Sequence, residues 1–148
     1  MAASDAILFE DMFDVDLYNP DGKLFEKVSR IVCETGSTTE ATLTLDVCTE
    51  VYKVKREDKI QFALASTLNL DGSPDNGLFN QSGERTLLDD YEYGMYGRVF
   101  EVKYLSKRRV QIYASFGGLL MCLEGEQNQF ERLEKDQQLY CLMRKAGG

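Results

Sequence analysis

Apolar and polar residues alternate with a period of two along most of the chain. The alternation is clearest at residues 109–116, RVQIYASF, where every second residue is apolar or aromatic. The same pattern recurs at residues 42–47 and 59–64 and extends to residues 7–18. This period is typical of a β-strand with one face in a core and one face in water. The pattern therefore predicts antiparallel strands, each with a solvated face.

Turn signals separate these runs. Asn19-Pro20-Asp21-Gly22 predicts a hairpin between residues 7–18 and 24–34, because proline presets φ and Asp-Gly tolerates the left-handed region. Gly117-Gly118 predicts a two-residue hairpin between residues 109–116 and 119–124, because glycine accepts the positive φ of such a turn.

The remaining segments are less regular. Residues 96–104 and 139–143 are further strand candidates with a less clean alternation. Residues 69–90 contain three glycines and one proline, and we expect one long surface loop there. Residues 126–134 predict a short helical turn, in which Phe130 and Leu133 lie three positions apart. Many short strands with polar turns predict an all-β fold closed into a single antiparallel barrel.

The segment after Gly118 has apolar residues on both faces of its strand. Leu119, Met121 and Leu123 face one way, and Leu120 and Cys122 face the other. A strand of this kind is covered on its second face. Either another part of the chain covers it, or a partner does.

Composition limits the chemistry. The 148 residues suit one domain, 1–148, and the net charge of -8 means that affinity for nucleic acid would need a local basic patch. The chain has no histidine, and none of its four cysteines has C-x-x-C spacing. We therefore expect no catalytic residues, no metal and no cofactor. We expect the cysteines to be reduced core residues, which is typical of the cytoplasm or nucleus.

Nothing in the sequence predicts a membrane segment or a small-molecule substrate. The first residues, MAASDAILFEDMF, lack the basic region of a signal peptide, and no apolar run approaches the length of a bilayer span. Carboxylates at residues 10–16 and 89–92 could hold an acid/base pair, as in a small enzyme. Acids that alternate with apolar residues are more often a solvated strand face, which is the interpretation that we favour.

One basic and aromatic cluster is a candidate nucleic-acid site. Lys23, Lys27 and Arg30 flank Phe25, and this combination could follow a single-stranded backbone. An ordinary hairpin whose basic residues balance nearby carboxylates is the simpler interpretation. A second basic group at residues 103–109 is most simply a solvated turn. Contact of this group with phosphate is the alternative.

Seven segments occur in an order and spacing that resemble one known family. The segments are ILFEDMFDV, KVSRI, TLDV, ASTLNLDG, DDYEYGMYG, SFGGLLMCLEG and CLMRK, from about Ile7 to Lys145. The chain resembles the small β-barrel subunit shared by eukaryotic RNA polymerases I, II and III, the eighth in the usual polymerase II count. The combination of DYEYxMYG with SFGGLLM is the most specific part of the match.

The resemblance implies an eight-stranded, OB-like barrel without catalytic activity. It also implies a place in the nucleus, including the nucleolus, and docking on the largest polymerase subunit and neighbouring assembly subunits. It further implies weak, non-specific binding of single-stranded DNA through residues 16–40, which contain the basic cluster above. The two most specific motifs suggest the partner-binding residues, which are Tyr93, Tyr96, Gly117, Gly118, Leu120 and Cys122.

The chain departs from the family pattern at two positions. Cys122 stands where the family usually has arginine, so a charge-assisted contact is expected to be missing there. Gly94 stands where the family has a larger apolar residue, and we expect looser packing around it.

The leading hypothesis is a structural polymerase subunit. A free-standing OB-type protein that binds single-stranded nucleic acid is the alternative, and a small enzyme is a third, weaker one.

Overall fold

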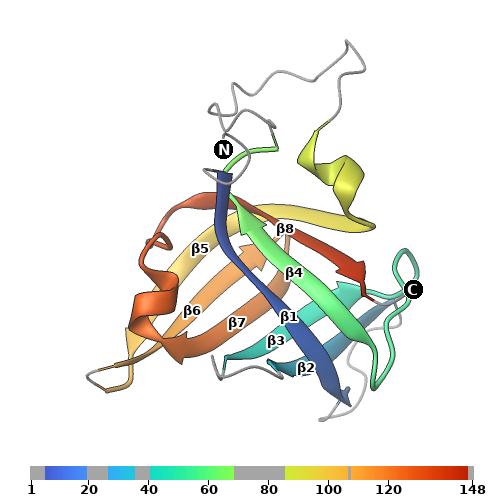
Figure 1. Ribbon diagram of the computed structural model, residues 1–148, viewed down its shortest axis with the longest axis horizontal. Coiled ribbons are helices and arrows are strands. Elements are labelled where there is room, and N and C mark those ends of the chain that lie inside the picture. Colours follow the sequence, from blue (N-terminus) through green and yellow to red (C-terminus); the bar gives the residue numbers. More distant parts are fainter. Residues whose placement is uncertain (1–5, 20–26, 36–40, 69–85, 107, 147–148) are drawn as a thin grey trace.

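Eight antiparallel strands close into a barrel (Figure 1). The computed structural model describes residues 6–19, 27–35, 41–68, 86–106 and 108–146. The strands are β1 (Ile7–Tyr18), β2 (Val28–Thr35), β3 (Thr42–Cys48), β4 (Lys59–Ala65), β5 (Tyr93–Tyr104), β6 (Arg109–Phe116), β7 (Leu119–Glu126) and β8 (Gln138–Lys145). Two short 3-10 helices are η1 (Leu87–Asp90) and η2 (Gln127–Phe130).

The order of strands around the barrel is β1-β2-β3-β7-β6-β5-β8-β4, and β4 pairs with β1 to complete the circle. Every strand therefore has a neighbour on both sides for at least part of its length, which leaves less strand edge open to pair with another chain. The closed all-β barrel predicted from the alternation is confirmed.

The barrel interior is filled by the apolar half of each alternating strand. In β6 the buried residues are Val110, Ile112, Ala114 and Phe116, as the pattern predicts. Aromatic rings fill the centre, where Phe13 meets Phe62 edge-on with their centroids 5.7 Å apart. All four cysteine thiols are free.

η2 follows β7 directly and supplies a core residue. The ring of Phe130 meets that of Phe9 at 5.1 Å, and Leu133 is buried beside it. Gly125 permits this packing, because a Cβ there would approach the Phe130 ring to 2.9 Å. The predicted helical turn at 126–134 is thus present, as a 3-10 helix shorter than that range.

The first hairpin differs from its prediction. β1 and β2 do pair, but Tyr18 lies opposite Ile31 and Lys27 is still in a turn, so the strand begins at Val28 and not at residue 24. Asn19 takes a positive φ of 49°, and the rest of the expected Asn19–Gly22 turn lies outside the described residues.

The end of the expected 69–90 loop is ordered against the barrel. Residues 69–85 lie outside the described residues, while Leu87 of η1 is buried on the outside of β4 and β8 with Ala63, Ala65 and Leu142. The next residue, Leu88, lies over Gly94, where a Cβ would come within 2.7 Å of its Cδ1 atom. The expectation of loose packing at Gly94 is wrong, because Leu88 occupies the space that a larger side chain would need.

The β6–β7 turn has the predicted geometry. Gly117 and Gly118 have φ values of 65° and 97°, and Phe116 pairs directly with Leu119. A Cβ at Gly118 would meet nothing within 4 Å, so a substitution there changes backbone strain and not packing.

We expect Gly118→Val to lower the free energy of unfolding by about 1–3 kcal/mol, because a β-branched residue is strained at positive φ. Urea denaturation measures the change. Gly118→Asn is the control, since asparagine tolerates the left-handed region, and it should cost clearly less. Equal losses for the two variants would contradict the strain argument.

Candidate partner-binding face

The outward-pointing residues of β5, β6, β7, β3 and β2 form one continuous surface, which we call the outer face. Cross-strand pairing fixes its rows. One row runs from Arg98 to Ser115 and Leu120, and the next runs from Tyr113 to Cys122 and Thr44. Three of the partner-binding residues suggested by the sequence, Tyr96, Leu120 and Cys122, belong to this face.

Leu120 is an exposed apolar residue on the outer face. Its neighbours in β7, Met121 and Leu123, are buried in the barrel, whereas 43% of Leu120 is exposed. β8 also has apolar residues on both faces, but there η1 covers Leu142 with Leu87. In the part of the chain that the structure describes, no comparable segment covers Leu120. A strand with two apolar faces can be covered by another part of the chain or by a partner. β8 is covered in the first way, whereas the outer side of β7 remains available to a partner.

A buried carboxylate holds the strands beside Leu120. Asp46 is only 6% exposed and binds the Arg30 guanidinium at two atoms, with distances of 2.7 and 3.1 Å. The β3–β7 ladder ends at Leu45 and Met121, and the next amide, the N–H of Leu120, donates to Asp46 Oδ2 at 3.0 Å. Asp46 thus extends the strand pairing by one residue and fixes the backbone that carries Leu120.

Cys122 lies between Thr44 and Tyr113 on the same face and is half-buried. Burial is the main cause that raises the pKa of the Cys122 thiol above its ordinary value, while a hydrogen bond with Tyr113 opposes the rise. The thiol is therefore neutral at physiological pH and contributes a small apolar surface, not a reactive thiolate.

Two of the three tyrosines in the DYEYGMYG motif, Tyr93 and Tyr96, point in opposite directions. Tyr96 is 49% exposed, and its hydroxyl donates to Gln138 Oε1 at 2.8 Å. Tyr93 is buried, stacks on Tyr52 with a centroid distance of 5.1 Å, and accepts the N–H of Cys48 at 3.3 Å. Of these two residues, only Tyr96 presents a surface to a partner. Gly117 and Gly118 are exposed at the β6–β7 turn.

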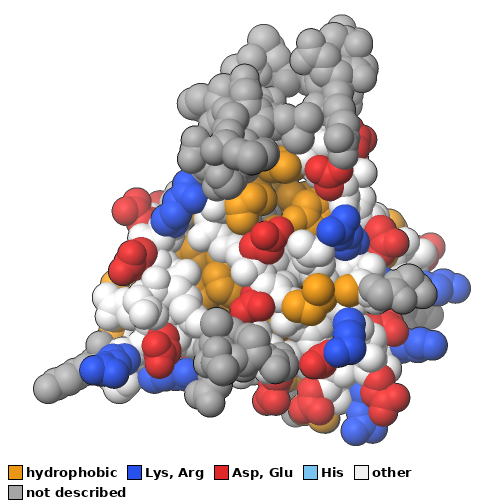
Figure 2. Space-filling view, viewed as in Figure 1, with side chains coloured by type: hydrophobic (Ala, Val, Ile, Leu, Met, Phe, Trp, Pro, Cys, Tyr) orange, Lys and Arg blue, Asp and Glu red, His pale blue; other side chains and the backbone are white. Residues whose placement is uncertain are grey.

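The structure describes two of the four residues of the candidate nucleic-acid site. Lys23 and Phe25 lie outside the described residues. Lys27 forms an exposed ion pair with Glu50 at 3.4 Å, and the Arg30 guanidinium is bound by Asp46. On the face over β1 and β4, Figure 2 shows basic and acidic side chains interspersed, without a large basic area. The charges of Lys27 and Arg30 are thus largely balanced within the chain.

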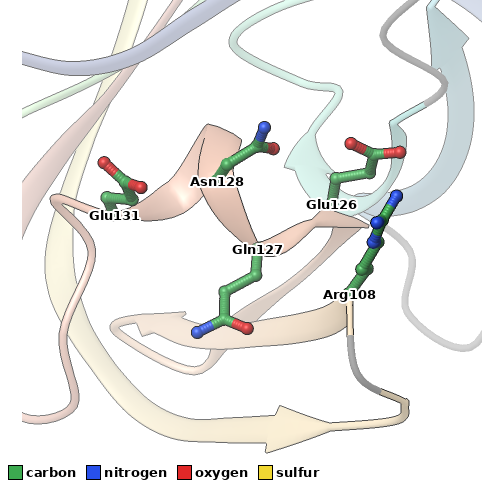
Figure 3. Close-up of a pocket in the computed structure, with 5 residues that line it drawn as sticks. All are labelled: Arg108, Glu126, Gln127, Asn128 and Glu131. Carbon is green, nitrogen blue, oxygen red and sulfur yellow. The ribbon is translucent and has the colours of Figure 1, made fainter.

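The cavity beside η2, lined by Arg108, Glu126, Gln127, Asn128 and Glu131, is polar, but its side chains do not converge. Figure 3 shows Gln127 on the opposite side of the segment from Asn128 and Glu131. The described residues also include no group of three or more potential metal ligands. None of the described helices is long and apolar enough to cross a membrane.

Sequence reasoning missed several residues of the outer face. Asp46 occupies a polar position of an alternating strand, so its burial and its bond to Leu120 left no sequence signal. Phe100 is exposed because the alternation of β5 places it on the outside, where the pairing of β5 with β6 becomes irregular. Arg98, between Tyr96 and Phe100, could have been found from the basic and aromatic composition of residues 96–104.

Comparison with known proteins gives a consistent result over nearly the whole chain. A family model described as RNA polymerase Rpb8 matches residues 10–145. A relative from Arabidopsis thaliana, named DNA-directed RNA polymerases II, IV and V subunit 8B, is 45% identical over 97% of this chain and 99% of its own length.

Two further relatives have similar names. The Dictyostelium discoideum protein named DNA-directed RNA polymerases I, II, and III subunit rpabc3 is 42% identical over 95% of this chain and 99% of its own length. The Saccharomyces cerevisiae protein named DNA-directed RNA polymerases I, II, and III subunit RPABC3 is 37% identical over 93% of this chain and 97% of its own length.

Proposed function

The chain belongs to the RNA polymerase Rpb8 family, and from this premise we propose that it is a non-catalytic, structural subunit of the DNA-directed RNA polymerases. The observation that carries the proposal is the match over nearly the full length to relatives that are each named as a polymerase subunit. All three names include polymerase II; two of them also give polymerases I and III, and the Arabidopsis thaliana name gives IV and V instead. We propose membership of polymerases I, II and III.

The absence of catalysis is part of the proposal. The chain contains no histidine, the commonest general base, and its half-buried Cys122 thiol is neutral. Its contribution to transcription is then to stabilise the assembled polymerase. Membership of these polymerases would place the protein in the nucleus, and membership of polymerase I would place it in the nucleolus.

We propose that the outer face docks on the largest polymerase subunit and on neighbouring assembly subunits. Leu120, Cys122 and Tyr96 supply apolar and aromatic contact area, and the exposed turn at Gly117 and Gly118 lets a partner backbone approach closely. Tyr93 is buried and does not touch the partner directly. Its stacking on Tyr52 supports the part of β5 that carries Tyr96.

A free-standing protein that binds single-stranded nucleic acid is less favoured. Lys27 and Arg30 are engaged by Glu50 and Asp46, so phosphate binding would first have to break these ion pairs. Any binding by Lys23, Phe25, Lys27 and Arg30 should be weak and should fall steeply as salt is raised.

Replacing Leu120 tests the docking proposal. We expect Leu120→Ser to weaken binding to the largest subunit about 10-fold, because an apolar side chain is lost from the interface. The stability of the free chain should change by no more than about 0.5 kcal/mol, because the side chain is exposed. Serine is preferred to aspartate, since a carboxylate at this position would lie beside that of Asp46.

Met12→Ser is the matched control. Met12 lies on β1 and is 42% exposed, close to the exposure of Leu120, but it is outside the outer face. Titration of each purified variant with the largest subunit, together with thermal unfolding of the free chain, measures both effects. Equal binding of the two variants would place the interface elsewhere on the barrel.

A further inference from the structure

The outer face contains a cleft that has the shape and charge to hold a carboxylate. Its lining residues are Tyr96, Gly97, Arg98, Phe100, Ser115 and Gln138, and its volume is about 360 Å³. This is near the lower end of the range for ligand pockets, about 300–1,000 Å³, and suits a side chain better than a large ligand.

Two aromatic rings form fixed walls on either side of Arg98. Tyr96 packs on Tyr140 with a centroid distance of 4.6 Å, and its hydroxyl is bound to Gln138. Phe100 packs on Tyr113 at 6.1 Å. Because these contacts hold both rings in place, a partner would lose little side-chain entropy on binding between them.

The backbone of β5 sets this arrangement. Residues 96, 98 and 100 alternate on the outside of the barrel, so Arg98 lies between the two rings. The pairing of β5 with β6 is irregular between Val99 and Glu101, so Glu101 also lies on the outside, directly after Phe100. Bulges of this kind often re-aim a side chain at a functional site.

Arg98 has no acidic partner among the described residues. It is exposed and takes part in none of the described ion pairs, whereas Arg30 and Arg109 on the same face bind Asp46 and Glu124. A guanidinium offers five donors in a planar fork that matches a carboxylate at two atoms. Arg98 therefore places a positive charge between two aromatic rings, on a chain whose net charge is -8.

We propose that this cleft binds an aspartate or glutamate side chain of the largest polymerase subunit, with an adjacent apolar residue of that subunit against Tyr96 or Phe100. The inference rests on the proposed function and names the chemistry of the partner segment at the docking face. A single carboxylate fits the local charge better than a nucleic-acid strand, because Glu101 lies beside Phe100 and would repel a row of phosphates.

Charge reversal at Arg98 tests the inference in the full chain. Arg98→Glu should weaken binding to the largest subunit by about 30-fold or more, because it places a carboxylate against a carboxylate. Arg98→Gln should fall between this variant and the wild type. Lys53→Glu is the control with the same change of charge. Lys53 is exposed and lies between β3 and β4, outside the outer face and the cleft, so this variant should lose less than about 3-fold.

The partner residue can be identified by rescue. Acidic surface residues of the largest subunit would be changed to lysine one at a time, and one of these changes should restore binding of Arg98→Glu while weakening that of the wild type. Thermal unfolding checks that each variant is folded.

The outcomes separate this inference from the proposed function. If Arg98→Glu binds as the wild type does while Leu120→Ser binds weakly, the carboxylate cleft is refuted and the docking proposal stands. If the wild type fails to bind the largest subunit, both are refuted. If Arg98→Glu loses affinity for a single-stranded oligonucleotide but retains assembly, the cleft binds phosphate and the protein partner is wrong.

Discussion

Gly97→Ala is expected to lower the free energy of unfolding by about 3 kcal/mol or more, the largest loss that we expect from the addition of one methyl group. β5 and β6 approach so closely at this point that a Cβ on Gly97 would overlap the carbonyl oxygen of Ser115 and come within 2.8 Å of Phe116 Cα. Both obstacles are backbone atoms, so no rotation of a side chain can relieve the overlap. The two strands would have to separate.

Gly118→Ala is the matched control for this prediction. It adds the same methyl group to a glycine with nothing within 4 Å, at a φ of 97°, and should cost only about 1 kcal/mol through backbone strain. Urea denaturation of both variants gives the comparison. A Gly97→Ala variant as stable as Gly118→Ala would show that β5 and β6 do not lie as close as described.

Asp46→Ala should cost about 2–3 kcal/mol of unfolding free energy. The substitution leaves the N–H of Leu120 without its acceptor and the Arg30 guanidinium without its carboxylate. Because Arg30 is partly exposed, water can solvate part of its charge, and the loss should stay below that for a fully buried pair.

Two comparisons isolate the role of Asp46. Asp46→Asn keeps a carbonyl acceptor and should lose about half as much. Glu50→Ala breaks the exposed pair with Lys27 and should change stability by no more than about 0.5 kcal/mol. Equal effects of Asp46→Ala and Glu50→Ala in denaturant titrations would mean that Asp46 does not hold β3 to β7.

Local sequence patterns predicted where the strands lie and the β6–β7 turn, but not where β2 begins. The alternation in residues 109–116 matches the burial of β6 residue by residue, because a strand between a core and solvent requires a period of two. Gly117-Gly118 predicted its turn because few other residues accept positive φ at both positions.

Contacts between distant segments could not be predicted in this way. Leu120 and Leu142 have the same local character, yet η1 covers one and leaves the other exposed. That difference depends on where residues 87–90 pack, which a strand pattern does not encode. For the same reason, the burial of Asp46 and the filling of the space above Gly94 by Leu88 became visible only in the folded chain.

The outer face connects the fold to the proposed function. Asp46 fixes the backbone of Leu120, and Gly97 lets β5 lie tightly on β6, so the apolar contact and the Arg98 cleft are held on one rigid sheet. A rigid surface of this kind loses little entropy when it binds a partner. Substitutions at Leu120 and Arg98 therefore test the outer face in the same chain whose binding to the polymerase tests the proposed role.

The most direct test of the polymerase role is the composition of the complex that contains this protein. The full-length chain, tagged and expressed at its natural level, would be purified from nuclei and its partners quantified by mass spectrometry. We expect the largest subunits of RNA polymerases I, II and III to be recovered, with their sum equimolar to the tagged chain. Recovery of the chain as a free monomer, with no polymerase subunit present, would contradict the account.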